Sequence, residues 1–125
     1  MSEYIRKFKP PKISKADLEK GIRYIDPVPQ VDYLGQNVVP GDIVIYTKGY
    51  SGTPDLVACK VIGLSTKVTP HAQSPEGSYQ SHGITVIYFE TWSNAIRRVT
   101  TYSSQIVKIL ESQYTEDIKE KLIPA

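Results

Sequence analysis

The chain has 125 residues, of which 40% are hydrophobic and 22% charged, and these values are ordinary for one globular domain rather than a disordered segment. Its one cysteine, Cys59, excludes an internal disulfide and a zinc site built on several cysteines. No stretch approaches the roughly 18 apolar residues that a membrane span needs, and the first residues form no apolar signal segment. We therefore expect no membrane association and a cytoplasmic location.

The net charge of +2 is unevenly distributed. Residues 1–25 carry seven Lys and Arg against three acids, residues 26–110 carry six against six, and residues 111–125 carry two against four. The basic character thus belongs to the first segment. A basic N-terminal arm is a common device for binding nucleic acid, although it also serves simply to solubilise a chain.

The first predicted elements lie in this basic segment. Residues 7–12 contain Pro10 and Pro11, so we expect them to be extended. Ser14 is a good N-cap for a short helix over residues 15–24, in which Gly21 is a weak point.

The remainder of the chain predicts strands. They fall near residues 43–47, 56–64, 84–91, 95–102 and 105–110. Gly63 inside the second strand indicates a bulge or a sharp bend. Residues 65–83 hold almost no aliphatic side chains and predict a long polar surface loop. Thr115 is expected to cap a last short helix over residues 116–123.

Two of these strands are apolar on both alternating sets of side chains, over residues 43–46 and 84–89. A strand that faces water on one side should alternate between apolar and polar residues. Something must therefore cover the outer surface of the sheet, and the two terminal helices are the candidates.

One family resemblance covers roughly residues 38–110. The run Gly41-Asp42-Ile43-Val44-Ile45-Tyr46, then Gly49 and Gly52, then Lys60-Val61-Ile62-Gly63-Leu64, resembles the opening of SH3-like barrels of the KOW and Tudor kind. The later Ser103-Ser104-Gln105-Ile106-Val107-Lys108-Ile109 looks like their short turn and closing strand. The tyrosine-rich chain with its appendages also resembles bacteriophage accessory proteins. Such barrels bind DNA, RNA, methylated side chains or peptides, so the resemblance implies a fold more than a function.

The fold prediction is therefore mainly β: a five-stranded antiparallel SH3-like barrel with a short helix at each end. Its parts are a basic N-terminal arm and short helix over 1–30, the barrel over 31–110, and a C-terminal helix over 111–125. Together they should form one compact domain.

Enzymatic chemistry finds little support in the sequence. His71 and His82 fall in the predicted loop without a carboxylate or further histidine at ligand spacing, and no glycine-rich phosphate loop is present. Cys59 lies in an apolar run and is expected to be a buried hydrophobe rather than a nucleophile. We expect no enzyme activity, no metal and no cofactor.

The first functional hypothesis is a nucleic-acid-binding accessory protein of weak sequence specificity, with DNA favoured over RNA. Basic residues would contact the phosphate backbone and aromatic residues near loops would stack on bases. The candidate phosphate contacts are Arg6, Lys7, Lys9, Lys12, Lys15, Lys20, Arg23, Lys48, Arg97 and Arg98. The candidate aromatic residues are Tyr46, Tyr50, Tyr88 and Trp92. On a strand Arg97 and Arg98 point to opposite faces, so at least one should project outward.

The alternative is a protein-interaction module. The aromatic residues would then line a groove for a partner protein or peptide, or the Pro10-Pro11 arm would dock in a partner's groove. A purely solubilising role for the cations also remains open.

Overall fold

The computed structural model describes residues 3–48, 55–90 and 93–121, and strands make up most of the regular structure in them. The helical elements are α1 (Glu3–Arg6), α2 (Lys15–Glu19), the 3₁₀ turns η1 (Ser103–Gln105) and η2 (Glu111–Gln113), and α3 (Glu116–Lys121). The strands are β1 (Arg23–Ile25), β2 (Gln30–Val31), β3 (Asn37–Val38), β4 (Ile43–Lys48), β5 (Asp55–Pro70), β6 (Ser78–Glu90), β7 (Ala95–Thr101) and β8 (Ile106–Lys108). The prediction of a mainly-β fold is confirmed.

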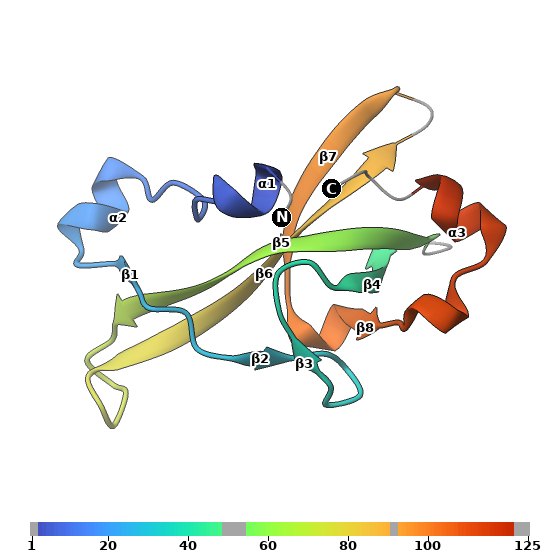
Figure 1. Cartoon of the computed structure of the whole chain (residues 1–125). Coiled ribbons are helices and arrows are strands. Elements are labelled where there is room, and N and C mark those ends of the chain that lie inside the picture. Colours follow the sequence, from blue (N-terminus) through green and yellow to red (C-terminus); the bar gives the residue numbers. More distant parts are fainter. Residues whose placement is uncertain (1–2, 49–54, 91–92, 122–125) are drawn as a thin grey trace.

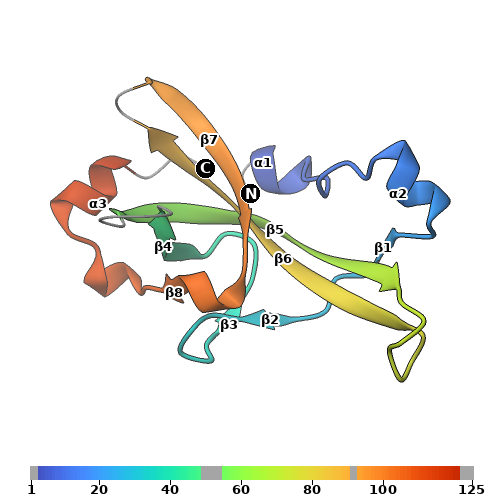
Figure 2. The same cartoon turned by 180° about the vertical axis from the view of Figure 1, so that it is seen from behind.

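One antiparallel sheet dominates the molecule (Figures 1 and 2), with the strand order β7-β6-β5-β4-β8. β1 joins it by pairing with the far half of β5, while β2 and β3 form a separate two-stranded ladder. No ladder joins β7 to β8 within the described residues, so the sheet there is open rather than a closed barrel.

The longest feature is the β5–β6 hairpin, which corrects the prediction of a polar loop over residues 65–83. The ladder continues from Ser65 opposite Gly83 to Pro70 opposite Ser78, and only residues 71–77 connect the two strands. Thr66 and Val68 are buried, which shows that alternate side chains of this segment enter the interior. The low aliphatic content of this segment was a poor guide because threonine also favours strands.

The helix predicted over residues 15–24 is also corrected. Ser14 caps α2 as expected, its hydroxyl accepting the Asp17 N–H at 3.2 Å, but the helix ends at Glu19. Gly21 follows with a φ of +85°, the left-handed conformation that terminates helices. The chain then extends into β1, which pairs with Thr66–Val68 of β5. At the other end of the molecule, Thr115 caps α3 as predicted.

The bulge predicted at Gly63 is confirmed. The register of β5 against β6 shifts between Val61 and Gly63, so that Ile62 is an extra residue. One face of the sheet carries the main hydrophobic core, formed by Val38, Val44, Cys59, Val61, Ile84, Val86, Tyr88 and Ile106. Burial raises the pKa of the Cys59 thiol to about 12, so this cysteine is a core residue.

Part of the opposite face is also covered, but by residues that precede the predicted helix over 15–24 rather than by the two predicted terminal helices. Ile62 and Ile87 are each 2% exposed although they lie outside the main core. A Cβ on Gly63 would lie 2.1 Å from the Phe8 ring, and one on Gly41 would lie 3.8 Å from Ile5. The N-terminal segment therefore packs on this face through α1 and the residues just after it.

Candidate nucleic-acid interface

The register assigns several basic residues to one face of the sheet. Lys60 lies opposite Ile87, and Ile87 lies opposite Arg98, so these three side chains form a row across β5, β6 and β7. Beyond the bulge, Gly63 lies opposite Thr85 on the same face, and Ser65 and Lys67 follow it by alternation. We call this surface the arm face, defined by Lys60, Gly63, Ser65, Lys67, Thr85, Ile87, Arg98 and Thr100.

The extended N-terminal segment, residues 7–12, is fixed on the arm face; we call it the arm. The Phe8 ring lies over Gly63, where any other side chain would collide with it. The Arg98 guanidinium carbon is 5.3 Å from the centre of that ring, and Nη2 of Arg98 donates to the Lys9 carbonyl at 2.5 Å. Farther along, the Tyr24 hydroxyl donates to the Pro11 carbonyl at 2.7 Å. Aromatic packing, a cation–π contact and two hydrogen bonds thus hold the arm in place.

The charges on this surface are all positive among the described strand residues. Lys60, Lys67 and Arg98 project from the sheet, and Lys9 and Lys12 of the arm are exposed. None of these five makes an ion pair with a described residue. Since no described Asp or Glu of the strands lies on the arm face, the strands contribute only positive charge to it.

The predicted arginine pair is split between the two faces, as alternation requires. Arg98 belongs to the arm face. Arg97 lies on the other side, where its Nε donates to Glu90 Oε1 at 3.0 Å. Glu90 also accepts a hydrogen bond from the Ser93 hydroxyl at 2.7 Å. Arg97 is therefore engaged within the protein.

The other predicted cations are spread along the N-terminal segment. Arg6 is exposed on α1, and Lys7 pairs with Glu3 at 2.7 Å in the same turn. Lys15, Lys20 and Arg23 are exposed around α2 and β1, beside the far half of β5 (Figure 1). Lys48 is the last residue of β4, and its side chain lies outside the described part of the structure.

The predicted aromatic residues do not gather on this surface. Tyr88 is 5% exposed and belongs to the core, and Tyr46 packs against that core on the same side. Tyr50 and Trp92 lie outside the described residues. Tyr102 directly follows β7 and is 59% exposed.

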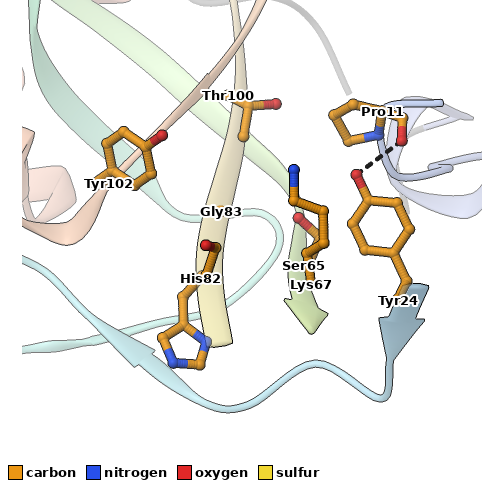
Figure 3. Close-up of a pocket in the computed structure, with 9 residues that line it drawn as sticks. Pro11, Tyr24, Ser65, Lys67, His82, Gly83, Thr100 and Tyr102 are labelled. Carbon is orange, nitrogen blue, oxygen red and sulfur yellow. Dashed lines mark hydrogen bonds between the residues drawn. The ribbon is translucent and has the colours of Figure 1, made fainter. Parts of the chain in front are cut away.

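A small cavity of about 120 Å³ opens on the arm face (Figure 3). It is lined by Pro11, Tyr24, Ser65, Lys67, Ser81, His82, Gly83, Thr100 and Tyr102. Burial raises the pKa of the Tyr24 phenol, so this hydroxyl stays protonated at neutral pH. The His82 ring points away from Lys67, and its Nδ1 lies 3.2 Å from the Thr66 hydroxyl.

Sequence reasoning missed Lys60, Lys67 and Ser65. Lys67 and Ser65 fall in the segment predicted to be a loop. Lys60 was missed because the bulge that brings it to the same face as Lys67 changes the direction of side chains, which residue composition does not reveal. Gly63 and Phe8 were visible signals, but nothing in the sequence links two residues so far apart.

Comparison of the chain with protein-family models, with curated proteins and with solved structures finds no match. Among the described residues, no three His, Cys, Asp or Glu side chains are grouped as metal ligands. The helices in this part of the chain are too short to cross a bilayer.

Proposed function

We propose that this protein is a non-enzymatic nucleic-acid-binding protein whose arm face contacts the phosphate backbone with weak sequence specificity. The observation that carries the proposal is the docking of the basic arm on the sheet beside Arg98. It joins the charges of two distant segments into one positive surface. Phosphate contacts of this kind supply affinity without reading the base sequence.

We also propose that the sheet is an SH3-like fold. Strands β4 to β7 follow one another as antiparallel neighbours, and β8 returns through the turn η1 to pair with β4. This order supports the likeness to the short turn and closing strand of that family. Since such folds are common nucleic-acid platforms, the likeness is compatible with the proposed function but does not decide it.

The test is fluorescence anisotropy with a labelled DNA duplex over a salt series, repeated with single-stranded DNA and RNA. Each contact with a duplex phosphate contributes about 0.9 to the slope of log affinity against log salt. Lys60→Gln, Arg98→Gln and Lys9→Gln should each flatten the slope by about that amount. We expect the duplex to bind more tightly than RNA.

A matched control removes the same charge elsewhere. Lys119 lies on α3, away from the arm face, and Lys119→Gln should leave the slope unchanged (Figure 1). Circular dichroism of every variant checks that the fold is intact. Absence of binding to all three probes at low salt, or an equal effect of the control, would refute the proposal.

A protein-interaction module is the second candidate, and the turn between β2 and β3 favours it. Tyr33 and Leu34 are 70% and 65% exposed on a turn that the buried Asp32 holds rigid. Two large apolar side chains side by side in the sequence on an ordered turn form a small exposed apolar patch that a partner could cover. A partner bound there would show a shallow salt dependence and would be lost with Tyr33→Ser and Leu34→Ser, whereas nucleic-acid binding would be unaffected.

A further inference from the structure

The cavity on the arm face is lined at one side by Gly83, where only a glycine fits without crowding its neighbours. A Cβ on Gly83 would lie 2.8 Å from Cγ2 of Thr100 and 2.9 Å from Oγ of Ser65. Any larger residue would therefore crowd this side of the cavity and cover the serine hydroxyl. The space of about 120 Å³ is well above the roughly 10–15 Å³ that one water requires.

Ser65 is the most informative residue of this cavity. Ser65 is 5% exposed as a residue, and its hydroxyl makes no hydrogen bond with any described residue. Since no fully buried side-chain oxygen lacks a partner in the described part of the chain, this hydroxyl is open to the cavity that it lines. Figure 3 shows this hydroxyl beside the Lys67 side chain, at the cavity. A hydroxyl that lines a cavity and has no protein partner is available to water or to a ligand.

Lys67 supplies a positive charge to the same space. Its side chain is half-buried, and its ammonium group has no ion pair or hydrogen bond with the described residues. In Figure 3 the nitrogen lies between Thr100 and the side of the cavity formed by Tyr24 and Pro11. No carboxylate is found among the described residues that line the cavity. The Tyr24 hydroxyl is neutral and already donates to Pro11, so nothing there offsets the lysine charge.

We propose that this cavity binds one phosphate group, which the Lys67 ammonium attracts and to which the hydroxyls of Ser65 and Ser81 donate hydrogen bonds. Charge-assisted hydrogen bonds of this kind are about twice as strong as neutral ones. The cavity is too small for a nucleoside, so the attached sugar and base lie outside it. The exposed ring of Tyr102, one of the residues that line the cavity, offers them a surface for stacking.

The proposal rests on the proposed function for its ligand, a phosphate of a nucleic acid, but its chemistry is tested separately. Amide chemical shifts of the full chain are recorded by NMR while sodium phosphate replaces sodium chloride at constant ionic strength and pH. We expect saturable shifts at residues 65, 67, 81 and 83. Shifts that never saturate would overturn the proposal.

Two variants assign the effect to the cavity. Lys67→Met should weaken phosphate binding at least tenfold, and Ser65→Ala should weaken it several-fold. Lys119→Met removes an equal charge from α3, away from the arm face, and should keep the wild-type affinity. Saturation unchanged in both cavity variants, or equally reduced in the control, would overturn the proposal. If Lys67→Met does not fold, the phosphate affinity of Ser65→Ala tests the proposal instead.

Oligonucleotides with a 5′-phosphate or a 5′-hydroxyl distinguish the two sources of the phosphate. If Lys67→Met weakens both equally, the cavity holds a backbone phosphate; if it removes only a preference for the phosphorylated end, it holds a terminal one. If Lys67→Met weakens neither while Arg98→Gln weakens both, the cavity proposal fails and nucleic-acid binding stands. If no oligonucleotide binds but inorganic phosphate saturates the cavity, the proposed function fails and the phosphate site stands.

Discussion

Replacing Asp32 by asparagine tests the polar anchor of the turn between β2 and β3. The side chain of Asp32 is 3% exposed, and its carboxylate accepts four hydrogen bonds. Oδ1 accepts from the backbone N–H groups of Leu34 at 2.9 Å and Gln36 at 2.8 Å. Oδ2 accepts from Nε2 of Gln36 at 2.9 Å and from the N–H of Lys108 at 2.7 Å. One carboxylate therefore ties the turn to β8.

The expected loss in free energy of unfolding follows from these four hydrogen bonds. Asparagine keeps one acceptor oxygen and replaces the other with an NH₂ group, so in either orientation two of the four donors face another donor. A hydrogen bond to a charged group contributes about 1.5–3 kcal/mol. We therefore expect Asp32→Asn to lower the free energy of unfolding by about 3–6 kcal/mol, a large share of the roughly 5–15 kcal/mol of a typical domain.

The assay is urea denaturation followed by intrinsic fluorescence, with Asp26→Asn as the matched control. Asp26 is exposed and makes no hydrogen bond or ion pair with a described residue, so its replacement should change the free energy of unfolding by less than about 0.5 kcal/mol. A loss of under about 1 kcal/mol for Asp32→Asn, with an unchanged m-value, would refute the reasoning about the turn.

The remaining predictions concern acid, the arm, the thiol and the hairpin loop. Burial alone would raise the pKa of Asp32, but its N–H donors lower it below the ordinary value. Its contribution to stability is therefore complete above the unfolded-state pKa of about 3.9 and is lost as the pH falls toward the pKa of Asp32 in the folded protein. Acid should consequently destabilise the wild type more than Asp32→Asn, which unfolding followed by circular dichroism over an acid pH series measures. Gly63→Ala places a Cβ 2.1 Å from the Phe8 ring and should cost about 1–3 kcal/mol in urea denaturation, less once Phe8→Ala is added; additive losses would contradict the contact. Cys59, with its raised pKa, should react with a thiol reagent only when the chain unfolds, and a rapid reaction of the folded protein would show that the core is open. Shortening the segment 72–76, which is exposed apart from the half-buried Ser74, to a tight turn should shift the melting temperature by no more than a few degrees, and a large fall would show that the segment is packed.

Much of the fold was predictable because its strands carry strong local signals. The β-branched runs marked β4, β6 and β7, and Gly63 marked the bulge. The outer half of the hairpin was not predictable from composition. Half of its side chains carry a hydroxyl, and their burial depends on β1 and the backbone at Val28, whose N–H donates to Thr66 at 2.9 Å. Pairing with β1, which is distant in the sequence, therefore makes a strand of a segment whose local pattern predicts a loop.

The candidate site was predictable only in part, and the bulge explains why. Lys60 and Lys67 are seven positions apart, an odd number that places them on opposite faces of a regular strand. The extra residue Ile62 reverses the alternation, so both point to the arm face. The split of Arg97 from Arg98, in contrast, follows from alternation within one regular strand and was foreseen.

The docked arm changes what its basic residues can contribute to binding. A disordered basic tail loses conformational freedom when it wraps a ligand, and that loss weakens its affinity. Here Phe8 on Gly63 and the hydrogen bond from Arg98 to the Lys9 carbonyl already order the chain. The charges of Lys9 and Lys12 are therefore presented at fixed positions before any ligand arrives. Deleting the arm would also uncover the apolar surface beneath Phe8, so loss of binding by such a truncation would mix lost charge with lost stability. Charge-neutral substitutions that keep Phe8 separate the two effects.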